Sequence, residues 1–274
     1  MARASAYPPP VHFPVIFHVG AFALPAHLVF ESLGYFLGFR SFLWLRGRWR
    51  DPLPTETRYL VIAAAVVGAA LGARILAMLQ NLPSQPSLAG LATAAGGKTI
   101  VGGLLGGFMS VEWVKRALGV RIRTGDLFVL PLCIGIAIGR VGCFLAGLTD
   151  HTYGNPTRLP WGVDFGDGLS RHPTQLYEIA ALALIAAWAW RARRSAGFET
   201  GDLFRGFITF YCAFRFALEV IKPEPRLALG MSAIQWTCLM AIGSQYSFAR
   251  RFLRYARGTR SAAPPIEPRP RAPR

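Results

Sequence analysis

Residues 139–178 read GRVGCFLAGLTDHTYGNPTRLPWGVDFGDGLSRHPTQLYE, a polar stretch that begins inside one apolar run and ends inside the next. Arg140 lies within the first of these apolar runs. A permanent charge in hydrocarbon is costly, so such residues usually face a bundle interior or a wet cavity and are functional candidates. The stretch therefore predicts a membrane protein with a charged functional site inside its helical bundle.

The composition agrees with a membrane protein. Of the 274 residues, 53% are hydrophobic and only 16% are charged, which is too apolar for an ordinary soluble domain. The four cysteines, Cys133, Cys143, Cys212 and Cys238, all fall in apolar runs. We therefore expect no disulfide, no metal site and no cofactor. The first 20 residues lack the pattern of a signal peptide.

Seven stretches are apolar enough, and near enough to about 20 residues, to cross a bilayer as helices. They are expected at Ala23–Leu45, Tyr59–Gln80, Thr99–Val114, Leu127–Leu148, Pro173–Trp190, Leu203–Ile221 and Leu229–Phe248. We expect an all-α protein with one seven-helix transmembrane domain over residues 1–248 and an outward loop at 149–172.

The Lys and Arg counts of the connecting segments alternate between low and high, beginning low before the first helix. Because cytoplasmic loops retain positive charge, the N-terminus is expected outside and the C-terminus in the cytoplasm. The net charge of +16 is thereby explained by topology and not by nucleic acid binding. Residues 249–274 are expected to be a basic, Pro-rich, disordered cytoplasmic tail lying against anionic membrane lipids.

With this orientation, Arg74, Arg140 and Arg215 all fall in the outer half of their helices. Guanidinium groups at one depth predict a site for an anionic group such as a lipid phosphate. The alternative is that they extend toward the outer headgroups, most readily Arg74 near a helix end. Glu178, within a predicted membrane helix, is expected to pair with these arginines, either within a binding site or as a purely structural ion network. Glu219 follows Arg215 by four residues and could pair with it.

Three other features have competing interpretations. The run AAGGKT resembles the end of a phosphate-binding loop, but no strand precedes it, so nucleotide binding is not expected. The glycines of the second and third helices, Gly68, Gly72, Gly102, Gly103, Gly106 and Gly107, have the spacing that permits close helix contact. Cys143 could be a nucleophile or a small apolar filler.

Six motifs stand in a definite order along the chain: VIFHVGAFAL, VGGLLGG, GRVGCF, RHPTQLYE, YCAFRFALEV and MSAIQW. With the seven-helix arrangement they resemble the prolipoprotein diacylglyceryl transferases, multi-pass enzymes of bacterial inner membranes. The resemblance implies transfer of diacylglycerol from phosphatidylglycerol to the lipobox cysteine of a preprolipoprotein, with release of glycerol phosphate. The attacking thiol would come from the substrate, so the enzyme would hold phosphate and favour the thiolate.

The same resemblance implies roles for individual residues. Arg140 would contact the headgroup and Arg215 the leaving phosphate, with Tyr211 on the same helical face. The outer wall of the site would include His172, Gln175, Tyr177 and Glu178. Further substrate contacts are expected from Gly102, Gly103 and Arg74.

The chain departs from the family pattern at four positions. Val101 stands where family members usually have histidine, and Cys143, Ala146 and Leu148 stand where they usually have polar residues. We expect His151, with Asp150 beside it, to supply the base. The alternatives are a non-catalytic relative that binds lipid, a transferase acting on a different acceptor, and a transporter for an anionic solute.

Overall fold

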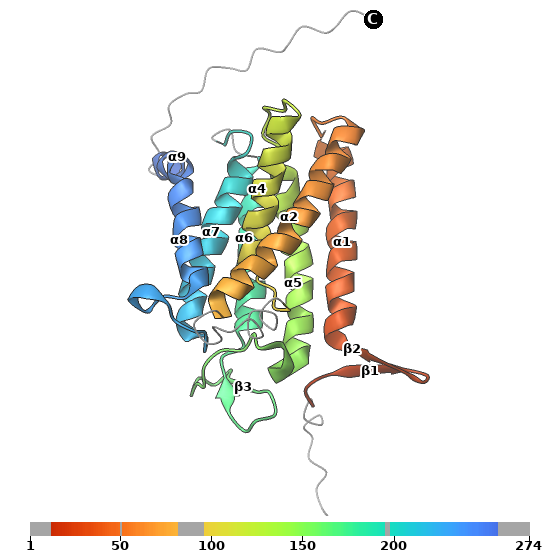
Figure 1. Cartoon of the computed structure of the whole chain (residues 1–274), viewed down its shortest axis with the longest axis vertical. Coiled ribbons are helices and arrows are strands. Elements are labelled where there is room, and N and C mark those ends of the chain that lie inside the picture. Colours follow the sequence, from red (N-terminus) through yellow and green to blue (C-terminus); the bar gives the residue numbers. More distant parts are fainter. Residues whose placement is uncertain (1–11, 50, 82–95, 195–197, 257–274) are drawn as a thin grey trace, which may run out of the picture.

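The computed structural model describes residues 12–49, 51–81, 96–194 and 198–256, with the side chains of residues 254–256 excepted. Its main element is a bundle of long helices, shown in Figure 1. The bundle helices are α1 (Ala26–Trp49), α2 (Thr55–Asn81), α4 (Ile100–Ala117), α5 (Val129–Ala146), α6 (Thr174–Ala192), α7 (Asp202–Leu218) and α8 (Ala233–Ser244). Short 3-10 turns join them: η1 (Gly125–Phe128), η2 (Gly147–Asp150), η3 (Glu219–Ile221) and η4 (Ala228–Gly230).

Different secondary-structure elements cover the two ends of the bundle. One end carries α9 (Tyr246–Ala256), which is viewed nearly along its axis in Figure 1 and so lies across the bundle. The other end carries a hairpin of β1 (Ile16–Val19) and β2 (Phe22–Pro25) and the loop that follows α5. We call these the α9 end and the hairpin end.

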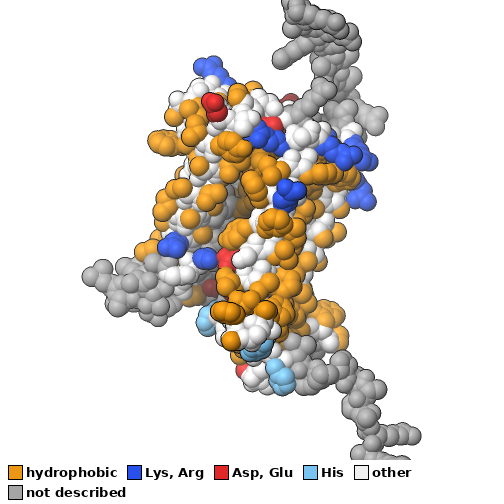
Figure 2. All heavy atoms as spheres, turned by 90° about the vertical axis from the view of Figure 1, so that its right-hand side faces the viewer, with side chains coloured by type: hydrophobic (Ala, Val, Ile, Leu, Met, Phe, Trp, Pro, Cys, Tyr) orange, Lys and Arg blue, Asp and Glu red, His pale blue; other side chains and the backbone are white. Residues whose placement is uncertain are grey.

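Long apolar helices dominate the structure, as expected of a membrane protein. The segments 26–49, 55–81 and 125–150 are long and apolar enough to cross a membrane. Large apolar side chains such as Phe36, Val66 and Leu184 are exposed along the helices, where a soluble protein would place polar ones. Figure 2 shows hydrophobic side chains over much of one side of the bundle, with Lys and Arg gathered toward the α9 end.

The main apolar core lies among α5, α6, α7 and α8. Leu182, Phe207 and Tyr211 at its centre are fully buried. The rings of Phe207 and Tyr211 stack with their centroids 5.9 Å apart, which fixes the face that α7 turns inward. That face carries the charged residues of the site described below.

Helices α2 and α4 pack on each other through glycine. A Cβ added to Gly72 would lie 2.4 Å from the carbonyl oxygen of Gly102, and one added to Gly102 would lie 2.3 Å from that of Gly72. Only glycine permits this approach of two backbones, which explains the small-residue spacing in both helices. The expected close contact of these helices is therefore confirmed.

Three parts of the structure differ from the sequence-based expectations. Residues 22–25 pair with 16–19 as an antiparallel strand, so α1 begins at Ala26 and the protein is not wholly α-helical. A second small hairpin, β3 (Val163–Asp164) with β4 (Ser170–Arg171), lies in the loop after α5. The last bundle helix ends at Ser244, and residues 249–256, expected in a disordered tail, belong to α9. Residues 257–274 lie outside the described residues.

Candidate active site

A buried cluster of charged side chains lies near the hairpin end, where α5, α6 and α7 meet. Its members are Arg140 of α5, Glu178 of α6, Tyr211 and Arg215 of α7, and Glu219 of η3, and each is at most 7% exposed. Charged side chains are almost never this buried unless they are paired. The cluster is therefore either a structural ion network or a binding site.

The centre of the cluster is the carboxylate of Glu178. Arg140 Nε lies 2.9 Å from its Oε2, and Arg215 Nη1 lies 3.7 Å from the same oxygen. The hydroxyl of Tyr211 donates a hydrogen bond of 2.6 Å to the other oxygen, Oε1. Arg215 also pairs with Glu219, four residues along the chain. The pairings expected for Glu178 and for Glu219 with arginine are both present.

Arg215 retains hydrogen-bonding capacity that the protein does not use. Arg140 Nε lies against the carboxylate of Glu178 in an ion pair, whereas Arg215 Nε is buried and has no hydrogen-bond acceptor among the described residues. A buried donor without an acceptor costs about 1–3 kcal/mol, and more for a charged group. Such donors are suited to the oxygens of an anionic ligand.

The sequence brings these side chains together through helix geometry. Tyr211 and Arg215 are four residues apart and project from one face of α7. Arg140 lies six residues before the end of α5, and Glu178 four residues after the start of α6. Because α5 and α6 are antiparallel neighbours, Arg140 and Glu178 reach the same level.

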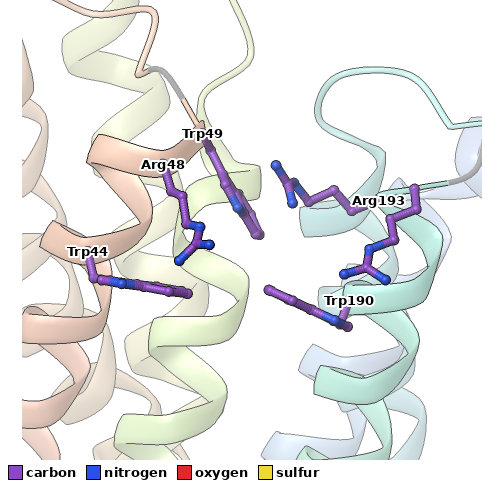
Figure 3. A pocket seen from close by; sticks show the side chains of 6 residues that line it. Trp44, Arg48, Trp49, Trp190 and Arg193 are labelled. Atoms are coloured by element: carbon purple, nitrogen blue, oxygen red, sulfur yellow. The ribbon is translucent and has the colours of Figure 1, made fainter.

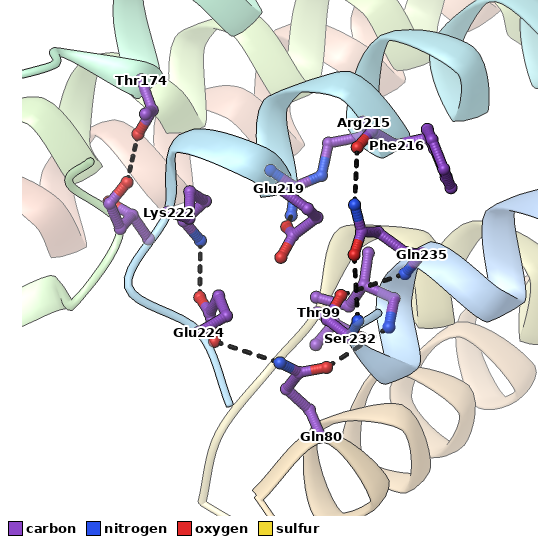
Figure 4. A network of polar contacts seen from close by, with 12 residues as sticks. Gln80, Thr99, Thr174, Arg215, Phe216, Glu219, Lys222, Glu224, Ser232 and Gln235 are labelled. Carbon is purple, nitrogen blue, oxygen red and sulfur yellow. Dashed lines mark hydrogen bonds and ion pairs between the residues drawn. The ribbon is translucent and has the colours of Figure 1, made fainter. Parts of the chain in front are cut away.

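A polar network holds the η3 turn beside Arg215 and Glu219 (Figure 4). Gln235, in the first turn of α8, donates to the carbonyl of Phe216 and accepts from Arg226. Gln80, at the end of α2, donates toward Glu224 and accepts from the backbone N–H of Ile234. These contacts tie α2, α7 and α8 together around one side of the cluster.

A second chain of polar contacts connects α6 to α1. Gln175 donates to the hydroxyl of Thr152, and that hydroxyl donates to Asp150 Oδ2 at 2.8 Å. Asp150 Oδ1 lies 3.4 Å from Nδ1 of His27, in the first turn of α1. The other ring nitrogen of His27 lies 3.6 Å from Glu31. His27 thus lies between two carboxylates, with its Nδ1 making no hydrogen bond within the described residues, and it was not among the residues expected from the sequence.

Cys143 lies between this chain and the buried cluster. Arg140 Nη1 is 3.6 Å from its sulfur. Donor atoms of His27, Cys143 and Asp150 also lie within 4.8 Å of one another, a spacing that metal ligands can have. The guanidinium beside the sulfur already places a positive charge there, so we assign no metal to this group.

The loop after α5 packs against the first turn of α6. The hydroxyl of Tyr177 accepts a hydrogen bond of 2.8 Å from the indole of Trp161 and lies 3.2 Å from Nδ1 of His172. The N-terminus of α6 is fixed to the loop by Thr174, which donates to the carbonyl of Thr152. Among the residues expected to form the wall, His172, Gln175 and Tyr177 thus contact the loop, and Glu178 lies in the cluster itself.

The structure does not bring every expected site residue to the cluster. His151 is exposed, with a left-handed φ of 51° that ends η2, and Asp150 pairs with His27 instead. Arg74 is exposed on α2 and has no hydrogen bond or ion pair within the described residues. Gly102 and Gly103 face α2, where they serve the helix contact. Substrate roles for these last three residues remain predictions.

Comparison with known proteins gives a consistent result. Residues 14–249 match the model of the family described as prolipoprotein diacylglyceryl transferase. A phosphatidylglycerol–prolipoprotein diacylglyceryl transferase of Nitratidesulfovibrio vulgaris strain DP4 is 32% identical over 238 residues, covering 82% of this chain and 88% of the relative. Proteins of the same name are 34% identical in Geobacter sulfurreducens, over 80% of this chain and 85% of the relative, and 33% identical in Nitrosomonas europaea, over 84% and 86%.

Proposed function

Because the chain belongs to the prolipoprotein diacylglyceryl transferase family, we infer that it is a transferase that moves a diacylglyceryl group from phosphatidylglycerol to a prolipoprotein. The match covers nearly all of the helical bundle, and the buried arginine cluster is the site suited to a phospholipid headgroup. We further propose that the acceptor is the thiol of the lipobox cysteine in a preprolipoprotein.

The reaction is a substitution at carbon. The acceptor's sulfur attacks the glyceryl carbon that carries the phosphate ester oxygen. A carbon–sulfur bond forms, the carbon–oxygen bond breaks, and glycerol phosphate leaves with the electron pair. The thiol gives up its proton to a base. The enzyme must therefore bind phosphate, stabilise the charge on the leaving group and accept a proton.

The two buried arginines are suited to the first two tasks. Arg140 and Arg215 come from different helices and converge on one carboxylate, so a phosphate near that carboxylate could contact both guanidinium groups. Planar guanidinium binds phosphate oxygens through paired hydrogen bonds, and burial strengthens the attraction. Tyr211 orients Glu178 and thereby fixes the positions of the arginines. This convergence is the observation that carries the proposal.

We assign the base to His27 instead of His151. The position that the family usually fills with histidine holds Val101, which is buried and cannot take a proton. His27 is the imidazole next to the arginine side of the site, since it approaches Cys143, which contacts Arg140. Asp150 beside Nδ1 would hold the ring in one orientation and stabilise its protonated form. The other charged groups near it are Glu31, on its own helix, and Lys98, which pairs with Glu31.

The proposed arrangement in the cell is a multi-pass protein of the bacterial inner membrane. Seven helices would span it, with the N-terminus and the hairpin end outside and the α9 end in the cytoplasm. The alternation of basic charge between the loops supports this orientation. It places the arginine cluster in the outer half of the membrane, where a secreted acceptor can reach it.

The function can be tested by complementation in a bacterium depleted of its own transferase. We expect the wild-type chain to restore growth and lipoprotein modification, and Arg140→Ala to fail at equal membrane abundance. The loss of the family's histidine favours one rival, a relative that binds lipid without catalysis. Failure of the wild-type chain, with phosphatidylglycerol binding retained, would establish that rival.

A further inference from the structure

A second group of basic side chains lies at the α9 end, far along the bundle from the arginine cluster. It is formed by the last residues of α1 and of α6 and the residues just after α6. Its members are Trp44, Arg48, Trp49, Trp190, Arg193 and Arg194, and they line a cavity of about 440 Å³. Figure 3 shows arginine and tryptophan side chains from the two helices facing one another across this cavity.

The arginines in this pocket stack on tryptophan rings. The guanidinium of Arg193 lies 3.9 Å from the ring centroid of Trp49, which belongs to the other helix. Arg48 lies over Trp44 at 4.9 Å and Arg194 over Trp190 at 5.3 Å. Stacking of this kind orders the guanidinium groups while their N–H edges remain free for hydrogen bonds.

Among the described residues, 12–49, 51–81, 96–194 and 198–256, no Asp or Glu forms an ion pair with Arg48, Arg193 or Arg194. The pKa of Arg193 is lowered, first by burial and then by the positive charges of Arg194 and Arg48. The three cations are therefore close enough to repel one another, and an anion between them would relieve that repulsion.

A simpler explanation accounts for only part of this arrangement. Basic residues in the last turn of a helix interact favourably with its dipole, and tryptophan is common at membrane interfaces. Neither effect requires cations from two helices to converge on one cavity. Neither effect requires Arg193, which follows α6, to stack on Trp49 of α1.

We propose that this pocket binds the phosphate headgroup of an anionic phospholipid, at the end of the bundle opposite to the arginine cluster. The cavity volume lies within the range of about 300–1,000 Å³ typical of small-ligand sites, which accommodates a headgroup. Arginine forks bind phosphate oxygens, and the exposed faces of Trp44 and Trp190 can contact the glyceryl and upper acyl carbons. With the α9 end in the cytoplasm, as proposed above, the occupant is a resident lipid of the inner leaflet and not a substrate in turnover.

The test counts bound lipids on the full-length chain purified in neutral detergent. Native mass spectrometry with dioctanoyl phosphatidylglycerol should show two lipids per wild-type chain. The triple variant Arg48→Gln, Arg193→Gln, Arg194→Gln should retain one and should keep its transfer activity within about twofold. Arg140→Ala should also retain one, because it alters only the other site.

The control is a second triple variant with the same loss of charge at the same end, Arg116→Gln, Arg121→Gln, Arg250→Gln. It should bind two lipids like the wild-type chain. The proposal is overturned if both triple variants lose lipid equally, or if neither loses any. It is also overturned if inorganic phosphate or dioctanoyl phosphatidylcholine displaces the second lipid as well as phosphatidylglycerol does. Lipid counts do not depend on turnover, so an inactive wild-type chain would refute the transferase function and leave this test intact.

Discussion

Arg140 and Glu178 form an ion pair in the interior of the bundle, with 2.9 Å between Nε and Oε2 and the carboxylate residue only 1% exposed. The pair joins α5 to α6, and Arg215 of α7 approaches the same oxygen. A single carboxylate thus links three helices and sets the distance between two guanidinium groups.

Removing that carboxylate should cost both stability and activity. In Glu178→Ala, Arg140 and Arg215 lose a shared counter-ion, and breaking a buried pair typically costs about 3–5 kcal/mol. Thermal unfolding of the detergent-purified protein measures the loss. Glu56→Gln, an exposed change on α2, should leave unfolding unaltered. Equal unfolding temperatures for Glu178→Ala and wild type would mean that the pair does not stabilise the bundle.

The assignment of the base predicts different effects at two histidines. His27→Ala should lower kcat/KM about 10²–10⁴-fold, the usual contribution of general base catalysis, while phosphatidylglycerol binding persists. His151→Ala should remain within about twofold of wild type, because its side chain is exposed and does not contact the cluster. Added imidazole should partly restore His27→Ala if the ring acts chemically. If His151→Ala lowered kcat/KM much more than His27→Ala did, the base would be His151.

A substitution of Cys143 distinguishes a mechanism in which the substrate supplies the nucleophile from one in which the enzyme supplies it. If the attacking sulfur belongs to the acceptor, Cys143→Ala should keep transfer to a lipobox peptide within a few-fold of wild type. The remaining effect would reflect the loss of its contact with Arg140. Loss of turnover with intact folding, together with a lipid adduct on Cys143 in the wild-type chain, would show covalent catalysis by the enzyme.

The contact between α2 and α4 should not tolerate a single methyl group. Gly72→Ala would place a Cβ 2.4 Å from a backbone oxygen of Gly102, so the helices must separate. We expect a cost of about 1–3 kcal/mol, as for other overpacked sites. Gly47→Ala in α1 is the control, because its Cβ would meet open space and alanine favours helix. Similar unfolding of the two variants would contradict the tight contact.

Acid sensitivity should arise in part at Asp51, between α1 and α2. Burial raises the pKa of this carboxyl. Hydrogen bonds from Arg58 and Leu53 and the charge of Arg46 lower the pKa by more than burial raises it, so the pKa of Asp51 in the folded protein is below its usual value. A depressed pKa in the folded state contributes stability above the unfolded value of about 3.9, and that stability is lost as pH falls through the folded value. Asp51→Asn should therefore destabilise the protein at pH 7 by about 3–5 kcal/mol, since Arg58 is fully buried. The difference from wild type should shrink below about pH 4. If the stability difference between Asp51→Asn and wild type did not change with pH, ionisation of Asp51 would not be a source of the acid sensitivity.

Helix positions and the charged cluster could be predicted because each follows from local sequence. Apolar runs mark the helices, and depth along antiparallel helices brings Arg140, Glu178 and Arg215 to one level. The approach of His27 to Asp150 could not be predicted, because it joins segments that are far apart in the sequence. The β1–β2 hairpin could not be predicted, because its residues are mostly apolar and exposed on both faces, without the alternation that marks a strand.

In the proposed site, the internal pairing of Arg140 with Glu178 would also limit how strongly a product is retained. An incoming phosphate would have to displace the carboxylate from guanidinium groups that are already compensated, so it binds by exchange and not by addition to vacant charge. If the cluster binds the headgroup as proposed, the carboxylate would return to the same groups when the product departs. Glu178 would then act as a resident competitor, and the free energy it recovers would favour release and prepare the enzyme for another turnover.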